Sequence, residues 1–422
     1  MPLRLGPISQ QLESMARSLA DQAPATRQYL EQAQELLHSI DADELREKLE
    51  QQRRQQVRLP WLVASPHDSL SGTHDAPPPP ADFCVVGTDA SSIAPDRHGS
   101  ARYYVLNIGY AVLCYGNNPH ATLESESRLC FSDEDLYIFP ERRDVPIEGG
   151  LLGAKMEVES LSILPRILDD CGDSHHPTNN EAASASRHRL GEANKGRPHP
   201  AGLPTAAIRD GPLTLWTLQS EDKKVQQALL HDLRQAMDSL REAQVPVAGY
   251  ISFTDGRDVA NSLRVHICEG QLNECDHCVN DRRSLCLELA QMHDRDLFSF
   301  LDTGQRSELF ASSSQILEQY GEHRIDFFYL NVGGEIARVE VPQWVRTNPD
   351  WLHFIHGAIA DQCRRSPGFP PYPPALQEAH EQAVITVTDR RVVEEMMERA
   401  MGQHGQKWIR SAKDDSKRRR GV

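Results

Sequence analysis

The sequence of 422 residues predicts a mixed α/β protein in which helices flank a β-sheet. Short apolar runs bounded by Gly, Asp and Ser, such as 83–92 and 101–112, are typical of interior strands. An amphipathic helical pattern at 225–244 leads directly into an apolar run at 245–253, and this alternation indicates an α/β layer. A hydrophobic fraction of 39% and a charged fraction of 25% are those of a globular protein.

The first 64 residues predict a helical segment that precedes the sheet. Apolar side chains recur there at helical spacing, and a break near Ala23–Ala25 is expected to divide the segment into two helices. Residues 65–82 form a predicted linker, because the four prolines at 77–80 make a stiff, extended piece of chain.

A carboxylate stands where the first predicted strand is expected to end. Asp89 follows the apolar run, and a polar turn follows Asp89. Carboxylate oxygens held by a rigid strand end suit Mg²⁺ or Mn²⁺. An ordinary Asp/Ser turn explains the same residues equally well. The choice depends on whether the rest of the chain supplies partner ligands.

Two further strands, at 121–131 and 136–139, are expected to extend the sheet, and a helix is expected at 151–169. In this helix Glu157 heads a face that leucines otherwise line, which is unusual because a lone buried charge is costly. Glu159 lies on a neighbouring helix face and is a rival for any role given to Glu157.

Residues 172–204 predict a disordered surface insertion, since they hold few apolar side chains and many Ser, Asn, His and Pro. The histidines within it are irregularly spaced, and we assign them no metal. Order returns at 206–216, a second strand that carries a carboxylate, Asp210, followed by Gly211. An Asp-Gly turn without further function would leave the same pattern.

Four cysteines are candidates for a structural zinc site: Cys268, Cys275, Cys278 and Cys286. The pair Cys275 and Cys278 has the C-x-x-C spacing, and four thiolates suit tetrahedral Zn²⁺. The outer spacings differ from those of a common zinc ribbon, so a zinc site and free cysteines both stay open. The nine cysteines are scattered and odd in number, unlike a secreted disulfide framework.

Apolar runs at 325–332 and 336–342 predict a hairpin across Gly333–Gly334. Arg338 and Glu340 alternate with apolar residues in the second run, which predicts one apolar and one charged face. The remaining expected elements are helices at 351–363, 375–381 and 391–401, followed by a basic tail at 402–422.

The charge balance restricts the class of function. Lys and Arg number 45 against 61 Asp and Glu, a net charge of −16, which excludes a surface coated with basic groups for non-specific nucleic-acid binding. A local basic groove, or a site where bound metal supplies positive charge, is compatible with it. No run approaches the roughly 18 apolar residues of a membrane span, and no signal-peptide pattern opens the chain. We expect a cytoplasmic protein without a membrane segment.

Several stretches together resemble the NurA family of DNA-repair nucleases. They occur in the family's order and span about residues 83 to 397: Gly87–Ser91, Asp210–Leu213, Phe327–Val332, Arg338–Pro342 and Tyr372–Glu381. Each stretch alone is weak evidence, but the ordered set is much more specific. Ala90 stands where the family often has glycine, and 53 residues separate Glu157 from Asp210, which leaves Glu157 and Glu159 as alternatives.

The resemblance implies a nuclease domain over residues 83–401 with an RNase H-like core, in which acidic residues on neighbouring strands gather divalent metal. Carried over by position, it implies five catalytic residues: Asp89, Glu157, Asp210, Tyr372 and His380. All but the tyrosine are implied metal ligands. A two-metal site for Mn²⁺ or Mg²⁺ needs several carboxylates and tolerates an imidazole, which agrees with this set.

The implied activity is a 5′-to-3′ exonuclease and single-strand endonuclease acting on DNA during the end resection of double-strand breaks. The resemblance also implies a homodimer that works with a hexameric ATPase of the HerA type. The candidate phosphate contacts are four arginines: Arg264, Arg295, Arg306 and Arg338. The competing interpretation is a catalytically silent nucleic-acid-binding or scaffold module on the same fold.

Overall fold

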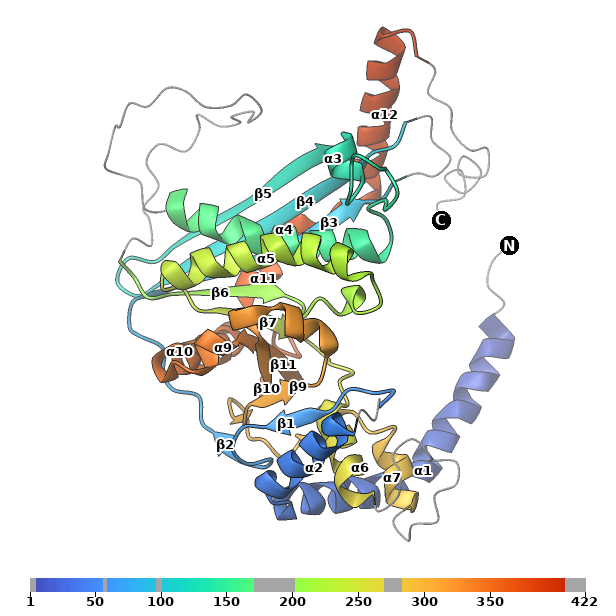
Figure 1. Cartoon of the computed structure of the whole chain (residues 1–422), viewed down its shortest axis with the longest axis vertical. Helices are drawn as coiled ribbons and strands as arrows, with labels where there is room; N and C mark the ends of the chain where they lie inside the picture. The colour runs from blue at the N-terminus through green and yellow to red at the C-terminus, as the bar shows by residue number, and fades with distance from the viewer. Residues whose placement is uncertain (1–4, 56–58, 96–100, 171–201, 269–282, 407–422) are drawn as a thin grey trace. The chain divides into compact units, whose positions relative to one another are not determined.

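The computed structural model describes residues 5–55, 59–95, 101–170, 202–268 and 283–406 (Figure 1). The chain forms two compact units, each assembled from three separate segments. Unit 1 comprises residues 1–76, 251–314 and 326–339, and unit 2 comprises residues 77–250, 315–325 and 340–422. The predicted mixed α/β class is confirmed, with 11 strands among the described residues.

Unit 2 is built on strands in the order β7-β6-β3-β4-β5. Their bounds are β3 Phe83–Ile93, β4 Tyr104–Tyr115, β5 His120–Cys130, β6 Thr205–Asp210 and β7 Val247–Ile251. Strands β3, β4 and β5 form an antiparallel meander, whereas β6 runs parallel to β3 and β7 runs parallel to β6. This arrangement is that of the predicted RNase H-like sheet.

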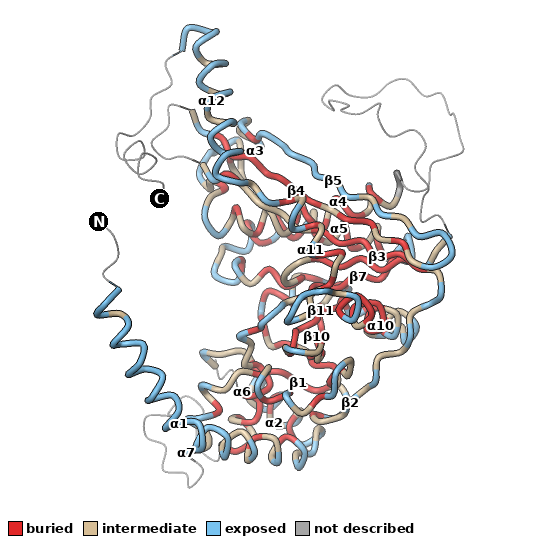
Figure 2. The backbone as a smooth tube through the Cα atoms, turned by 180° about the vertical axis from the view of Figure 1, so that it is seen from behind, coloured by how far each residue is buried: buried red, intermediate tan, exposed pale blue. Residues whose placement is uncertain are grey.

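Helices cover both faces of the unit 2 sheet (Figures 1 and 2). Helices α4 and α5 pack together on one face, and α11 packs against β3 and β4 on the other. The helices of this unit are α3 Asp133–Leu136, α4 Gly150–Asp170, α5 Lys223–Glu242, α9 Gln343–Arg346, α10 Pro349–Arg365, α11 Pro374–Ala383 and α12 Val387–Gln403. Short 3₁₀ turns lie at Trp216–Leu218, Gln315–Gln319 and Gly321–His323.

Unit 1 has a core of its own, in which aromatic rings stack between strands and helices. Phe298 stacks on Tyr329, and Phe310 stacks on Phe327. Its strands are β1 Ala64–Pro66, β2 Thr73–His74, β8 Arg306–Ser307, β9 Phe310–Ser312, β10 Ile325–Asn331 and β11 Ile336–Pro342, the last continuing into unit 2. Its helices are α1 Leu5–Ser39, α2 Ala42–Arg54, α6 Asp258–Ile267, α7 Arg283–Leu289 and α8 Asp294–Leu297.

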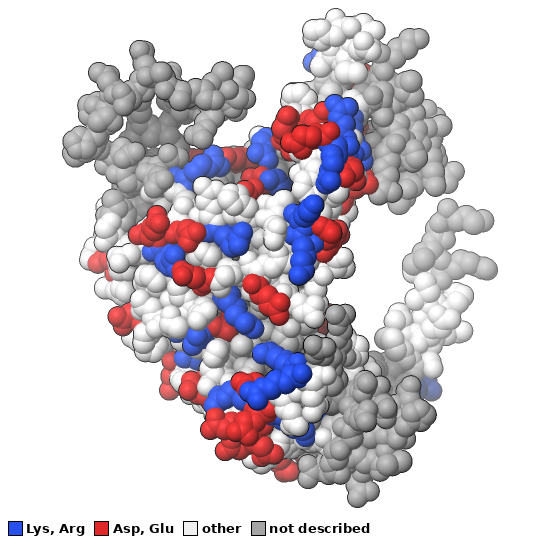
Figure 3. Space-filling model, viewed as in Figure 1, with Lys and Arg blue, Asp and Glu red and all other residues white. Residues whose placement is uncertain are grey.

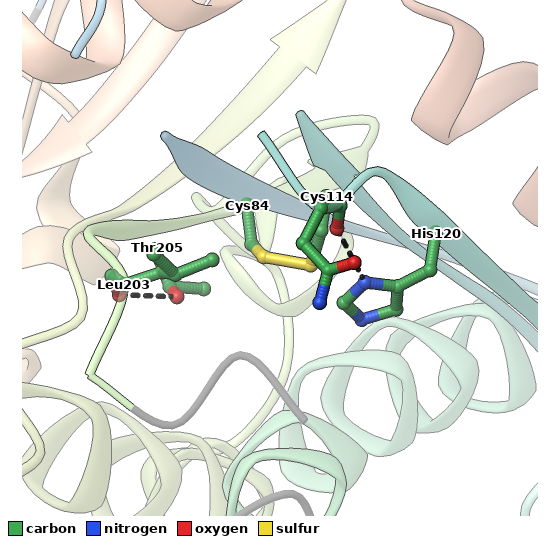
Figure 4. Close-up of a disulfide and its surroundings, with 6 residues drawn as sticks. Cys84, Cys114, His120, Leu203 and Thr205 are labelled. Atoms are coloured by element: carbon green, nitrogen blue, oxygen red, sulfur yellow. Dashed lines mark hydrogen bonds between the residues drawn. A yellow bond between two sulfur atoms is a disulfide. The ribbon is translucent and has the colours of Figure 1, made fainter. Parts of the chain in front are cut away.

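A disulfide that the sequence did not predict joins Cys84 to Cys114 (Figure 4). The two cysteines are directly opposite each other in the antiparallel β3–β4 register. Both side chains are buried. The bond therefore cross-links the two strands at the end of the meander away from Asp89.

Most predicted elements are confirmed. The predicted linker 65–82 holds strand β2 and most of β1, which pair with β8 and β9. A predicted strand and a predicted helix break are wrong. Residues 136–139 are not a strand, because Ser132 and Asp135 form a capping box that starts α3, and only an isolated bridge follows at Tyr137. No break occurs near Pro24, since α1 continues through it. The chain instead turns at Asp41, whose carboxylate caps α2 by accepting the Asp43 and Glu44 amides.

Some predictions fall outside the described residues: almost all of the 172–204 insertion with its histidines, most of the basic tail, and Cys275 and Cys278. Among the helices that the structure describes, none combines the length and the hydropathy of a membrane span.

Candidate metal centre

Strands β3 and β6 bring two carboxylates side by side. Thr88 is the register partner of Arg209 in the parallel pair, so the next residues along, Asp89 and Asp210, are also neighbours. Because side chains alternate along a strand, both point to the face opposite to that of Thr88 and Arg209. Asp89 lies within β3, which continues to Ile93, and not at the strand end that the sequence predicted. Asp210 does end its strand.

Helix α11 adds an imidazole to this pair. It approaches the sheet closely at two glycines: a Cβ on Gly87 would lie 2.2 Å from the Ala375 carbonyl oxygen, and one on Gly109 would lie 2.2 Å from that of Ala379. Larger residues at these positions would hold the helix away. As a result, His380 Nδ1 lies 2.8 Å from Asp89 Oδ2.

Asp89, Asp210 and His380 each offer one ligand atom, and these atoms all lie within 4.8 Å of one another. Two carboxylates and an imidazole suit Mn²⁺ or Mg²⁺. The backbone amide of Ala90 donates to Asp89 Oδ1 at 2.7 Å, which fixes the orientation of that carboxylate and leaves Oδ2 toward the histidine.

Tyr372 also reaches the centre. Burial raises the pKa of the Asp210 carboxyl, a hydrogen bond from the Tyr372 side chain lowers it, and the neighbouring Asp89 raises it again. The Tyr372 ring packs edge-on against Tyr250 with ring centroids 5.5 Å apart. Tyr250 is the register partner of Asp210, so this aromatic contact helps place the hydroxyl group of Tyr372 against the carboxylate.

Three buried side chains hold the turn that follows Asp210. Arg209 donates to the Pro212 carbonyl oxygen, and Glu340 Oε2 accepts the amides of Leu213 and Thr214, each at 2.9 Å. The Tyr320 hydroxyl group accepts the Leu215 amide at 2.8 Å. Gly211 has φ +95°, a conformation that favours glycine, and begins the turn. Glu340, predicted on a charged face, is therefore fully buried.

The two candidate glutamates of α4 have different surroundings. Glu159 pairs with Arg128 at 2.9 Å and with Lys155 at 3.0 Å. Burial raises the pKa of Glu159, but these two cations outweigh it and lower the pKa overall. Glu157 Oε2 is buried without a hydrogen-bond partner among the described residues. Burial raises the pKa of Glu157, Arg209 opposes the rise and Glu340 adds to it. Neither glutamate belongs to the three-residue group.

A model of a known protein family matches most of the chain. The NurA domain model matches residues 84–385, more than half of the chain.

The chain belongs to the NurA family.

The match confirms the predicted family. NurA proteins are nucleases of DNA processing. No curated protein matches the chain. Among solved structures, 8 chains match, and one of them is described as a crystal structure of NurA. That chain shares 11% sequence identity with this one at a TM-score of 0.33, over 93% of this chain and 97% of the other.

The four arginines proposed to contact phosphate all lie in unit 1 of this NurA protein. Arg306 and Arg338 are each only 4% exposed. Arg338 pairs with Asp258 at 3.4 Å, and Arg306 donates to the Ser307 carbonyl oxygen at 2.8 Å, so both serve internal contacts. Arg264 stacks over the Trp61 ring at 4.0 Å, and Arg295 pairs with Asp255 at 2.6 Å. These last two remain partly exposed.

The zinc prediction concerns four cysteines, of which Cys268 and Cys286 are described. Both are half-buried against the core of unit 1. The sequence did not point to Arg209 and Tyr320, which hold the turn after Asp210. Arg209 directly precedes Asp210, and alternation along a strand could have placed it on the opposite, covered face. Tyr320 lies 110 residues after Asp210 in the sequence, and no local pattern pointed to it.

Proposed function

We propose that this NurA protein is a divalent-metal-dependent nuclease that cleaves DNA. The observation that carries the proposal is the convergence of Asp89, Asp210 and His380 within 4.8 Å on an RNase H-like sheet. The partly buried carboxylates and the aimed imidazole fit a hard divalent cation.

Each residue has a distinct part in the proposal. Asp89 and Asp210 hold the metal, and His380 completes the ligand group from α11. Tyr372 orients Asp210 through its hydroxyl group. Glu157 is retained as a further ligand by its position in the family order, and its Oε2 is buried without a hydrogen-bond partner among the described residues. Bound divalent metal would polarise the phosphodiester and lower the pKa of an attacking water.

The finer activity follows the family. We propose 5′-to-3′ exonuclease and single-strand endonuclease action with Mn²⁺ or Mg²⁺, in the end resection of double-strand breaks. We also propose a homodimer in the cytoplasm that receives DNA from a HerA-type ATPase. Lys and Arg are interspersed with Asp and Glu on the face shown in Figure 3, so DNA binding would rest on local groups and bound metal.

The experiment compares Asp89→Asn and Asp210→Asn with the unaltered chain and with Asp350→Asn, an exposed carboxylate in the same unit. The substrates are end-labelled linear DNA and circular single-stranded DNA, with Mn²⁺, Mg²⁺ or chelator. We expect both centre variants to lose at least about 100-fold in cleavage rate and the control to keep its rate. Full activity in both centre variants, with unchanged circular dichroism, would overturn the assignment.

A further inference from the structure

The first half of α1 carries large apolar side chains on an exposed helix (Figure 2). From residue 5 to residue 28 every residue is exposed except Ile8, which is half-buried. Four of the exposed side chains are large and apolar: Leu5 at 66%, Leu12 at 53%, Met15 at 53% and Leu19 at 59%. The second half of the helix differs, because Ala33 and Leu37 are buried in the core of unit 1. One end of α1 is therefore anchored, and the other presents apolar surface to solvent.

The exposed apolar side chains of this half follow a strict heptad repeat. Leu5, Leu12 and Leu19 are seven residues apart, and Ile8 and Met15 each stand three residues after a leucine. In heptad notation the leucines occupy the a positions, and Ile8 and Met15 occupy the d positions. A helix that packs on a globular core has a wider apolar stripe, whereas a narrow a/d stripe is typical of a coiled coil. We call these five side chains the α1 seam.

The residues beside the α1 seam carry no charge. The flanking e and g positions hold Ser9, Gln11, Ala16 and Ser18. The nearest charged residues, Glu13, Arg17 and Asp21, fall at the b, f and c positions, on the side of the helix away from the seam. Charged e and g residues select a partner of opposite charge and repel an identical helix. Because the flanks are neutral, a second copy of the same helix meets no repulsion.

This half of α1 also has few contacts of its own that would hold it helical. Most helical stability in proteins comes from the packing of an apolar face. An exposed helix without such packing relies on many ion pairs, and between residues 5 and 28 the structure describes one, Glu13 with Arg17 at 2.5 Å. Pro24 lies inside the helix and removes one hydrogen bond between its two halves. A partner helix would supply the missing apolar contact.

We propose that the α1 seam forms a short coiled coil with the α1 seam of a second copy of this chain. A second copy provides the same heptad repeat and the same neutral flanks, which are the two properties that the seam requires of a partner. The NurA domain match begins at residue 84, so this surface lies outside the family domain. The proposal does not rest on nuclease activity. Since the seam spans fewer than three heptads, we expect weak association that is lost on dilution.

The test is self-association of the full chain, measured by sedimentation velocity over a series of protein concentrations. The seam variant carries Leu12→Gln and Leu19→Gln. The matched control carries Glu13→Gln and Arg17→Gln, two substitutions in the same turns on the opposite side of the helix. We expect the seam variant to weaken self-association at least about 10-fold and the control to change it less than about two-fold. A protein that lacks residues 1–22 should behave as the seam variant does.

Equal self-association of the seam variant, the 1–22 deletion and the unaltered protein would overturn the proposal and leave a different protein as the occupant of the seam. An equal loss in the control variant would also overturn it, because the effect would then not come from the apolar side of the helix. The proposed nuclease function is tested independently, since sedimentation requires neither metal nor DNA.

Discussion

At the scale of single residues, the two glutamates of α4 are the sharpest contrast. Glu159 is held by Arg128 and Lys155, whereas Glu157 has a buried oxygen without a hydrogen-bond partner among the described residues. A carboxylate that is already ion-paired is a poor candidate ligand, and an unpartnered one is available to a cation. We expect Glu157→Gln to reduce Mn²⁺-dependent cleavage at least about 10-fold and to weaken Mn²⁺ binding, measured by electron paramagnetic resonance.

Glu159→Gln is the matched control, since it removes one charge from the same helix two residues away. It should keep cleavage and Mn²⁺ affinity within a factor of about two, at some loss of stability from the two broken, partly buried ion pairs. If Glu159→Gln were the variant that loses metal binding, the family assignment of Glu157 would be wrong.

A second prediction at this scale concerns Asp294 in unit 1. Asp294 is fully buried and accepts the amides of Val259 and Ala260 and the hydroxyl group of Tyr329. Burial, with a smaller contribution from Asp258, raises its pKa from 3.8 to about 6. Because the folded pKa lies above the unfolded one, the resulting stability is present at low pH and is lost as the pH rises through about 6.

Urea unfolding at several pH values, with Asp294→Asn as the comparison, measures this effect. The uncharged asparagine does not titrate. The free energy of unfolding of the unaltered protein should therefore fall relative to that of the variant by up to about 3 kcal/mol between about pH 4 and pH 7. A difference that stays constant with pH would show that Asp294 keeps an ordinary pKa.

Asp89 and Asp210 could be found from the sequence because each follows an apolar run. Each also belongs to a stretch that occurs in the order typical of the NurA family. The burial of Arg306 and Arg338 could not be predicted from the sequence. A sequence shows that a residue is charged, but only the fold shows that β11 is covered on both faces, with all seven of its residues buried. The same limit hid Glu340, whose carboxylate is satisfied by two amides more than a hundred residues away in the sequence.

At the scale of elements, the closeness of α11 to the sheet decides where His380 lies. A Cβ on Gly109 would stand 2.2 Å from the Ala379 carbonyl oxygen and 2.3 Å from the Ala383 nitrogen. Both are backbone atoms, so the helix must shift as a whole. We expect Gly109→Ala to displace His380 from Asp89 and to lower the cleavage rate by about 100-fold, the effect of roughly 1 Å of misplacement.

Gly153→Ala provides the control, because nothing lies within 4 Å of the added Cβ in the first turn of α4. It should keep full activity and gain about 0.5–1 kcal/mol of stability from the better helix former. Thermal unfolding and cleavage assays on both variants check the pair. Unchanged activity in Gly109→Ala would mean that the position of α11 does not govern the centre.

Elements with strong patterns were predictable, and those decided by a local cap were not. The long periodic helices and the alternating strands of unit 2 carry their signal in ten or more residues. The apolar residues 136–139 resemble a strand. The capping box at Ser132 nevertheless starts a helix over Asp133–Leu136. In α1, a proline that removes one hydrogen bond does not end a helix of 35 residues.

At the scale of the whole molecule, the N-terminal helices belong to the core of unit 1 and do not form a separate segment. Ala33 and Leu37 of α1 and Leu45 and Leu49 of α2 are buried in the same cluster as Phe298. The side chain of Gln34 also donates to the Leu297 carbonyl oxygen at 3.1 Å. By contrast, the first part of α1 exposes its apolar residues, with Leu12 at 53% and Leu19 at 59%.

Two truncated proteins test this division of α1. Among the described residues, removal of residues 1–22 takes away only exposed side chains and the half-buried Ile8. This deletion should therefore leave thermal unfolding unchanged. Removal of residues 1–54 deletes three buried leucines, at roughly 2–5 kcal/mol each, a sum comparable with the whole stability of a typical domain. We therefore expect limited proteolysis to cut residues 283–314 rapidly in the 1–54 deletion, while these residues stay protected in the 1–22 deletion. Equal protection of this segment in both truncated proteins would show that unit 1 folds without its N-terminal helices.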